Sequence, residues 1–432
     1  MDKVRYAVVH LLMRQEHGGY SNLVLQNALE QYKDFSFRDK AFLSAVFYGT
    51  VERQFTIDYL LQMYLNRPLE KLDPVVRAIL RTGLYQARWM DSVPVRAAVN
   101  ESVTLTKAVR KTSAAGMVNA VLRKAAEFDL DKITFCDEIQ RLSVLYSVSP
   151  EIASLFLNKI PNYERILQDS FKQPRLCIRV NSLKTTQEKV EKYFQEKGFA
   201  VHTGRVPGCL YVDYHGELAA DSSFQNGEFH VQGEASQIAC ATLCPQPGER
   251  VLDVCAAPGG KSVTLAQYMK NEGILCASDA AANRISLIER AFQRCGVTCG
   301  TVLCADASVF REEQCQADAV LCDVPCSGLG ILAKKPDIRH KDLKGLAELQ
   351  QLQLKILSVS ARYVKPGGRL VYSTCTLNPD ENESVVRAFL DKESDFFVKN
   401  VSFAKEKSGM VTFYPYGEEQ DGFFIASLER KR

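Results

Sequence analysis

The sequence of 432 residues lacks any apolar run that approaches the roughly 18 residues of a membrane-spanning helix. It also lacks the apolar stretch that follows the start of a secreted precursor, because the chain begins Met1-Asp2-Lys3 and continues with mixed residues. Both absences argue against a membrane or secreted protein. We therefore expect a cytoplasmic globular protein with no membrane partner.

Clustered metal ligands are missing as well. The six histidines are dispersed, and none of the 14 cysteines forms a C-x-x-C pair. Zinc sites need closely spaced ligands, so we predict no metal site. In a long chain without a secretion signal, the cysteines are expected to be reduced thiols, most of them buried as small apolar residues.

A strong excess of one charge is also absent. The net charge is only +3, which does not indicate a strongly basic nucleic-acid binder. The charge is unevenly distributed, however. Residues 1–130 hold 18 Lys and Arg against 13 Asp and Glu, a balance of +5, so the remainder sums to −2.

The first third of the chain has apolar residues at helical spacing, such as Val4, Ala7, Val8 and Leu11. These repeats predict an all-helical domain over residues 1–135. Its exposed helix faces are expected to carry nine basic residues: Arg77, Arg81, Arg88, Arg96, Lys107, Arg110, Lys111, Arg123 and Lys124. Two interpretations stay open, namely solvated helix faces or a surface that contacts RNA phosphates.

The rest of the chain mixes helix and strand patterns. Residues 136–240 predict a small accessory α/β module, and residues 241–432 alternate strands and helices. The alternation predicts a Rossmann-like α/β domain with a doubly wound, mainly parallel sheet. In such a sheet, ligands bind at the carboxyl ends of the strands.

The stretch Val251–Lys261, VLDVCAAPGGK, opens this domain. A buried apolar strand leads into a turn of small residues, and a helix follows at once. Small residues let the backbone approach a ligand, and the helix start offers free N–H groups. The turn is neither the GxGxxG dinucleotide motif nor a phosphate-binding P-loop, which would need a Lys-Ser/Thr pair.

Three carboxylates follow consecutive predicted strands: Asp279, Asp306 and Asp323. An acid at the end of the second strand is placed to accept the ribose hydroxyls of a nucleotide. One such Asp alone is more often a turn former, but three in register after a glycine turn favour a nucleotide site.

Two cysteines follow the fourth and fifth strands, in Asp323-Val-Pro-Cys326-Ser-Gly and Ser373-Thr-Cys375-Thr. Adjacent strand ends converge, so Cys326 and Cys375 are expected to face one pocket. A lone cysteine in this chain would most simply be a core thiol. Here each follows an abrupt turn that exposes a side chain, and we expect helix N-termini at the site to favour the thiolate.

The segments DVCAAPGGK, LCDVPCSG and YSTCTLNPDENE resemble the motifs of the Fmu/Sun family of S-adenosylmethionine-dependent 16S ribosomal RNA (cytosine-5)-methyltransferases. Residues 1–130 are similar to the NusB-like RNA-binding domain of these enzymes, so the resemblance covers nearly the whole chain. It implies a class I methyltransferase domain over 241–432 and an RNA-recognition role for 136–240. It also implies 16S ribosomal RNA as the partner, and we expect a monomer.

The resemblance assigns residues to roles. It implies Cys375 as the nucleophile that attacks carbon 6 of cytosine and Cys326 as the second cysteine, which assists its release. It implies that S-adenosylmethionine is held by Cys255, Ala256, Ala257, Pro258, Gly259, Gly260, Lys261, Asp279, Asp306 and Asp323. Asp323 is also suited to the N3/N4 edge of the cytosine, where a carboxylate stabilises developing charge.

Two positions depart from the family pattern: Gly233 stands where Asp is usual, and His340 where Trp is common. They put local RNA contacts in doubt, not the reaction. Two other functions were weighed. An exocyclic-amine methyltransferase would have an aromatic residue after the fourth strand, and Pro325-Cys326-Ser327 lacks one. A silent RNA-binding assembly factor would not need the paired cysteines.

Overall fold

The computed structural model describes residues 2–16, 18, 21–405, 407–416 and 421–432. By compactness the chain divides into two units. Unit 1 comprises Met1–Glu164 together with Lys335–Asp342, and unit 2 comprises Arg165–Lys334 and Leu343–Arg432. Within the described residues, no helix is both long and apolar enough to cross a membrane.

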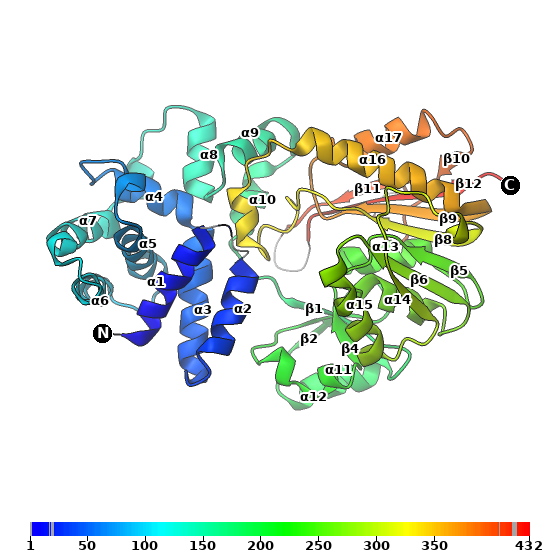
Figure 1. Cartoon of the computed structure of the whole chain (residues 1–432), viewed down its shortest axis with the longest axis horizontal. Helices are drawn as coiled ribbons and strands as arrows, with labels where there is room; N and C mark the ends of the chain where they lie inside the picture. The colour runs from blue at the N-terminus through cyan, green and yellow to red at the C-terminus, as the bar shows by residue number, and fades with distance from the viewer. Residues whose placement is uncertain (1, 17, 19–20, 406, 417–420) are drawn as a thin grey trace. The chain divides into compact units, whose positions relative to one another are not determined.

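Unit 1 is helical, as the sequence predicts (Figure 1). Its helices are α1 (Lys3–Glu16), α2 (Ser21–Gln31), α3 (Phe37–Glu52), α4 (Gln54–Gln62), α5 (Pro74–Trp89), α6 (Val95–Ala108), α7 (Ala115–Glu127), α8 (Glu138–Tyr146) and α9 (Pro150–Lys159). Helix α5 begins where the sequence indicates, because Asp73 accepts a hydrogen bond from the Val75 N–H and Pro74 needs none at the first turn. Fully buried side chains such as Val46, Ile79 and Val118 form one core between the helices.

A distant segment completes unit 1. Residues Lys335–Asp342, which include the short 3-10 helix η6 (Pro336–His340), belong to it although they follow the predicted catalytic loop in sequence. The Arg339 side chain is fully buried there and donates to the Tyr146 carbonyl at 2.9 Å, and the Asp337 carboxylate accepts from Ser21. Such long-range insertion has no local sequence signal.

Unit 2 contains a small sheet and a large one. The small sheet has the order β2-β3-β1-β4, with β1 (Leu176–Val180), β2 (Val201–Thr203), β3 (Cys209–Val212) and β4 (Phe229–Val231). All its pairings are antiparallel. Helices α11 (Gln187–Glu196) and α12 (Ser222–Gln225) contact this sheet, and α10 (Tyr163–Asp169), which spans the unit boundary, precedes β1 in the chain. Cys177 and Tyr211 share a core with Ile238 of the following helix, so this module packs on the larger domain.

The large sheet has the order β10-β12-β9-β8-β5-β6-β7, with β11 paired to β12. Its strands are β5 (Arg250–Asp253), β6 (Ile274–Asp279), β7 (Gly300–Cys304), β8 (Ala317–Asp323), β9 (Val364–Thr374), β10 (Phe396–Val398), β11 (Met410–Phe413) and β12 (Phe423–Arg430). Strands β5 to β9 pair in parallel and β10 to β12 antiparallel. The predicted doubly wound, mainly parallel sheet is confirmed.

Helices cover both faces of this sheet (Figure 1). On one face lie α13 (Glu234–Leu243), α14 (Gly260–Tyr268) and α15 (Ala282–Cys295), and on the other α16 (Leu346–Tyr363) and α17 (Glu383–Leu390). Successive strand residues alternate between the two cores: Val251 and Leu321 face the first, and Leu252 and Val320 the second. Burial on both faces explains why the strands read as continuous apolar runs.

The division into units differs from the predicted boundaries. Residue 135 falls inside unit 1, because α8 packs on α4 and α9 packs on α8. Residue 240 falls within α13, inside unit 2, because that helix packs on β1 of the small sheet and on β8, β9 and β12 of the large one. The predicted boundaries follow the change of helix and strand pattern along the chain, whereas the units follow packing between distant segments.

Candidate active site

The strand order reverses between β5 and β8, and the predicted site residues gather there. Asp253 ends β5, Asp323 ends β8, and the two strands are direct neighbours, with Asp253 opposite Leu321. In open α/β sheets this reversal leaves a crevice at the carboxyl ends of the strands. The fold therefore places the aspartates and the glycine turn at one crevice.

The turn after β5 has the backbone that its sequence suggests. Gly259 has φ 104°, and a Cβ there would lie 3.1 Å from the Ile288 Cα, so both conformation and space favour glycine. A cavity of about 220 Å³ lies against the turn. Seven predicted cofactor residues line it: Cys255, Ala256, Ala257, Pro258, Gly260, Lys261 and Asp323.

Three other predicted cofactor residues, Gly259, Asp279 and Asp306, do not line that cavity. Asp279 is buried at the end of β6, where it accepts from the Ala257 N–H at 3.2 Å and pairs with Arg284 at 3.3 Å. Asp306 follows β7 and is exposed. The Ser308 N–H donates to its carboxylate at 2.8 Å, which lowers the pKa of Asp306.

A partly buried charge pair lines the cavity. Lys261 Nζ is 2.7 Å from Asp323 Oδ2, and the Ser373 hydroxyl donates to Asp323 Oδ1 at 2.6 Å. The Asp323 carboxylate holds the pKa of Lys261 above its usual value against the opposing effect of burial. Burial also raises the pKa of Asp253 to about 7, although Ser262 donates to its Oδ2. The crevice therefore contains groups in unlike protonation states, a common property of functional sites.

The two predicted cysteines meet in this crevice. Cys326 Sγ and Cys375 Sγ are 3.2 Å apart, and both side chains are partly buried. The convergence inferred from the strand ends is thus observed. The expectation of a thiolate-favouring setting is not met at Cys326, because the hydrogen bond to Cys375, burial and the nearby Glu381 and Asp323 charges all raise its pKa.

Glu381 was not singled out from the sequence. Its carboxylate is fully buried and accepts from the Ser327 N–H at 2.8 Å and the Ser327 hydroxyl at 2.6 Å. It also accepts from Gln353 at 3.0 Å and Asn378 at 3.1 Å. Ser327 adjoins Cys326, and Asn378 follows Cys375 by three residues, so this carboxylate joins the two cysteine loops. The Asn-Pro-Asp-Glu-Asn run after Cys375 was the available signal.

Four of the nine basic residues expected on exposed helix faces have structural partners. Arg81 is buried and pairs with Glu16 and Asp58, and Arg77 also pairs with Glu16 at 2.8 Å. Arg88 donates to the backbone carbonyls at the end of α7. Five others are exposed: Arg96, Lys107, Arg110, Arg123 and Lys124. The ninth, Lys111, pairs with Asp73.

Both departures from the family pattern have a structural account. A Cβ at Gly233 would collide with the Asp421 carboxylate, which pairs with Lys334 at 2.7 Å. His340 is partly buried in unit 1, where its ring stacks on Phe55 and Nε2 lies 2.8 Å from the Val51 carbonyl. These contacts give the His340 ring a packing role within unit 1.

Within the described ranges, no group of three or more His, Cys, Asp or Glu side chains could hold a metal ion. The groups observed at the crevice are two thiols, a lysine and carboxylates.

Comparison with known proteins agrees with this geometry. Residues 240–429 match the family described as 16S rRNA methyltransferase RsmB/F, and residues 2–127 match the NusB family. The chain is 32% identical to a probable ribosomal RNA small subunit methyltransferase B of Bacillus subtilis over 98% of each chain. It is 34% identical to the protein of the same description from Synechocystis over 95% of each chain. The crystal structure of PH0851 superposes with a TM-score of 0.84 at 28% identity, covering 99% of this chain and 98% of that one. The chain belongs to the RsmB/F family of 16S rRNA methyltransferases, with a NusB-type helical domain before the catalytic one.

Proposed function

We propose that this methyltransferase transfers a methyl group from S-adenosylmethionine to carbon 5 of a cytosine in 16S ribosomal RNA, through a covalent bond between Cys375 and carbon 6. The pair of thiols 3.2 Å apart beside the Asp323–Lys261 ion pair carries this proposal. Carbon 5 of cytosine is a poor nucleophile, and addition of a thiolate to carbon 6 turns it into an enamine carbon that accepts an electrophile.

The residues around the glycine turn fit the cofactor. S-adenosylmethionine supplies an electrophilic methyl group when bound. The cavity of about 220 Å³ is lined by the small residues of the turn together with Asp253, Lys261 and Asp323. Small residues suit a ligand that the main chain approaches closely. The ten residues Cys255, Ala256, Ala257, Pro258, Gly259, Gly260, Lys261, Asp279, Asp306 and Asp323 remain the proposed cofactor set. Arg284, paired with Asp279, would have to share that carboxylate with a ribose.

The two cysteines and Asp323 each have a role in the proposed catalytic cycle. The Cys375 thiolate forms a bond to carbon 6, while Asp323, fixed by Lys261 and Ser373, accepts a hydrogen bond from the N3/N4 edge of the base. Carbon 5 then takes the methyl group. A water that Cys326 positions, or the Cys326 sulfur itself once it has lost its own proton, accepts the carbon 5 proton. The carbon 6–sulfur bond breaks, and its electron pair returns to Cys375 as the double bond of the ring reforms.

The two thiols give a direct test. Cys375→Ala should abolish methylation without any protein–RNA adduct, because no bond to carbon 6 can form. Cys326→Ala should methylate once and stall, leaving a complex that survives denaturing electrophoresis. If the adduct instead forms with Cys375→Ala and not with Cys326→Ala, then Cys326 is the nucleophile and Cys375 is the cysteine that assists release. Methylation at the wild-type rate by both variants would refute the covalent mechanism.

The substrate base and the protein's state in solution are tested separately. Bisulfite sequencing of 16S ribosomal RNA from cells with and without the gene should show one cytosine whose protection depends on it. The monomeric state expected from the sequence is tested by light scattering, and the expected cytoplasmic location by cell fractionation.

A further inference from the structure

A second groove lies in unit 2, outside the crevice that holds the cysteines. It has a volume of about 480 Å³. Its lining combines cationic and aromatic side chains with one strand: Arg205, Glu383, Lys405, Met410, Val411, Thr412, Phe413, Tyr414 and Tyr416. None of these residues has a role in the proposed methyl transfer.

The aromatic side chains of the groove are arranged as a stack. The rings of Tyr414 and Tyr416 are 5.9 Å apart at 28°, and the Arg165 guanidinium lies 4.7 Å from the Tyr416 ring centroid. Both tyrosines are only partly buried. Stacked rings flanked by cations are the common means by which proteins hold unpaired nucleotides, since every base offers a π-face.

The sheet register relates this groove to the nucleophile. Phe413 of β11 lies opposite Phe423 of β12, and Phe424 lies opposite Thr374 of β9. Cys375 follows Thr374, so Phe413, Phe423 and Cys375 form one row across three strand ends. Neighbouring strands are about 4.8 Å apart, which puts the start of the Tyr414 segment about 10 Å from the nucleophile. A nucleotide next to the target cytosine can cover that distance.

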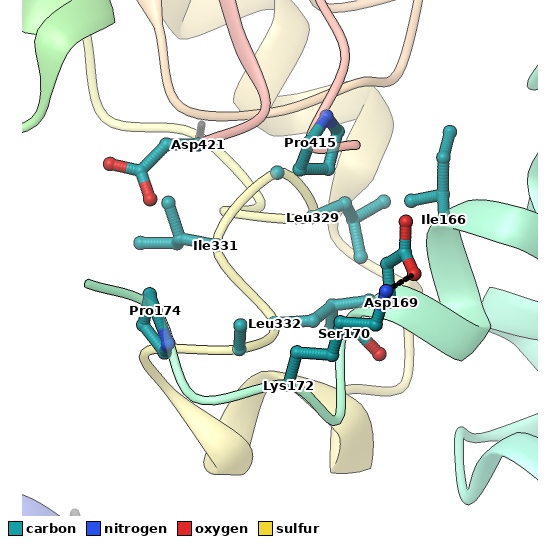
Figure 2. Close-up of a pocket in the computed structure, with 12 residues that line it drawn as sticks. Ile166, Asp169, Ser170, Lys172, Pro174, Leu329, Ile331, Leu332, Pro415 and Asp421 are labelled. Atoms are coloured by element: carbon teal, nitrogen blue, oxygen red, sulfur yellow. Dashed lines mark ion pairs between the residues drawn. The ribbon is translucent and has the colours of Figure 1, made fainter. Parts of the chain in front are cut away.

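Backbone contacts hold the two regions together. The Gly330 N–H donates to the Cys375 carbonyl at 3.0 Å, and the Gly330 carbonyl accepts from Gly422 at 2.8 Å. Figure 2 shows Pro415, between the two tyrosines, beside Leu329 of the loop that follows Cys326. The tyrosine segment is therefore braced against the cysteine loops.

The charge of the groove suits an anion. The lining of the groove includes two cations, Arg205 and Lys405, and one carboxylate, Glu383. Glu383 accepts a hydrogen bond from the Thr412 hydroxyl at 3.1 Å. Arg205 is also 3.7 Å from Glu234, so its charge is partly balanced. Arg165 adds a third cation at the Tyr416 ring.

We propose that the groove of Tyr414, Tyr416, Arg205 and Lys405 binds an unpaired RNA nucleotide that neighbours the target cytosine, with the base on the tyrosine rings and the phosphate near the two cations. This inference rests on the proposed function, because it takes the substrate to be RNA. It adds a site that contributes to RNA affinity without touching the reacting atoms.

Steady-state methylation of a 16S ribosomal RNA transcript tests the groove. Tyr416→Leu and Tyr414→Leu should each raise KM for RNA by roughly five- to a hundredfold, the range for losing one stacked base. The kcat and the affinity for S-adenosylmethionine should stay at wild-type values. Tyr416→Phe keeps the ring and should retain the wild-type KM.

The cations are tested by salt dependence. Arg205→Gln and Lys405→Gln should each reduce the slope of log affinity against log salt by roughly one phosphate contact. Phe397→Leu and Lys399→Gln are the matched controls, because this exposed aromatic–lysine pair lies at β10 of the same sheet, with Phe397 on the strand and Lys399 just after it, near the other end of β12. These controls should leave KM and the salt slope unchanged.

If both leucine variants remain active and have the wild-type KM for RNA, the proposal that the groove binds an RNA nucleotide is refuted. A rise in KM matched by a loss of thermal stability, or shared by Tyr416→Phe and the controls, would also overturn it. If the wild-type protein methylates no RNA, the proposed function fails instead. Fluorescence anisotropy with a single-stranded oligonucleotide then still decides whether the two tyrosines bind a base.

Discussion

Replacing Glu381 by Gln tests how the two cysteine loops are held. The two carboxylate oxygens each accept two close hydrogen bonds: Oε2 from the Ser327 N–H and Gln353, and Oε1 from the Ser327 hydroxyl and Asn378. The Thr376 hydroxyl adds a longer hydrogen bond of 3.4 Å to Oε1, and no ion pair to this carboxylate is found among the described residues, so hydrogen-bond donors stabilise its charge. The substitution keeps the shape of the side chain and changes one acceptor into a donor.

The expected magnitude follows from that count. In either orientation of the Gln amide, two of the four donors lose their acceptor, and each unsatisfied buried donor costs about 1–3 kcal/mol. Loss of a buried charge offsets part of this cost. We therefore expect the free energy of unfolding to fall by about 2–4 kcal/mol, which corresponds to roughly 5–15 °C in Tm for a domain of this size. Displacement of the cysteine loops by about 1 Å should lower kcat by roughly a hundredfold.

Alkylation of Cys326 by iodoacetamide separates a chemical role from simple destabilisation. The hydrogen bond to Cys375 and burial raise the pKa of Cys326, and the Glu381 charge adds to them. Removing that charge should lower the pKa, so Glu381→Gln should be alkylated at Cys326 at a lower pH than the wild type. Mass spectrometry of the Cys326 peptide against pH measures this shift.

Two controls make the result decisive. Glu381→Asp keeps the charge on a shorter side chain, so it should lower kcat without moving the alkylation profile to lower pH. Glu383→Gln removes a nearby carboxylate that bonds only Thr412 among the described residues, and should leave kcat and the profile unchanged. A Glu381→Gln enzyme with wild-type kcat, Tm and alkylation profile would refute the reasoning.

Three further predictions concern the cofactor, the helical unit and pH. Asp279→Ala should weaken S-adenosylmethionine binding by about one to two orders of magnitude in calorimetry, because a charged hydrogen bond contributes about 1.5–3 kcal/mol; unchanged affinity in a folded variant would exclude the assignment. Arg123→Gln with Lys124→Gln should reduce the salt slope of RNA binding by the full-length protein, whereas an unchanged slope would favour solvated helix faces. The folded-state pKa of Asp253, about 7, exceeds its unfolded value, so its contribution to stability is present below about pH 4 and lost as pH rises through 7. The stability difference between Asp253→Asn and the wild type should therefore shift in favour of the variant by about 3 kcal/mol from pH 5 to pH 8, because about two pH units separate pH 5 from the folded-state pKa. Thermal unfolding at the two pH values measures this.

Local sequence patterns, namely apolar runs and the residues that end them, were enough to predict the strands of the catalytic domain and the residues at their ends. The strand before the glycine turn, the aspartates at strand ends and the two cysteines all follow from apolar runs that stop at a polar or small residue. Since parallel strands end at one edge, placing Cys326 and Cys375 after neighbouring strands was enough to bring them together. The 3.2 Å separation agrees with that inference.

Three features could not be predicted from local patterns because they depend on contacts between residues far apart in the chain. Arg81 has the spacing of an exposed helix residue, yet two carboxylates from other helices bury it. Residues 335–342 belong to unit 1 because Arg339 and His340 find partners there that are nearly 200 and 300 positions away. Glu381 lies in the segment YSTCTLNPDENE, which resembles a family motif. The donors that define its environment, Gln353 and Ser327, lie 28 and 54 positions away.

The raised pKa of Cys326 is consistent with the proposed cycle once the thiols are treated as a pair. Two sulfur atoms 3.2 Å apart in a buried site cannot both carry a negative charge, so a proton is shared between them and their titration belongs to the pair. A protonated Cys326 donates to the Cys375 sulfur, which stabilises the Cys375 thiolate before attack and again when it leaves carbon 6. The hydrogen bond to Cys375 and burial raise the pKa of Cys326, and the Glu381 and Asp323 charges add to them, so the thiolate of Cys326 is disfavoured. The surroundings of Cys326 therefore favour its protonated form, which is the form that can donate to the sulfur of the proposed nucleophile.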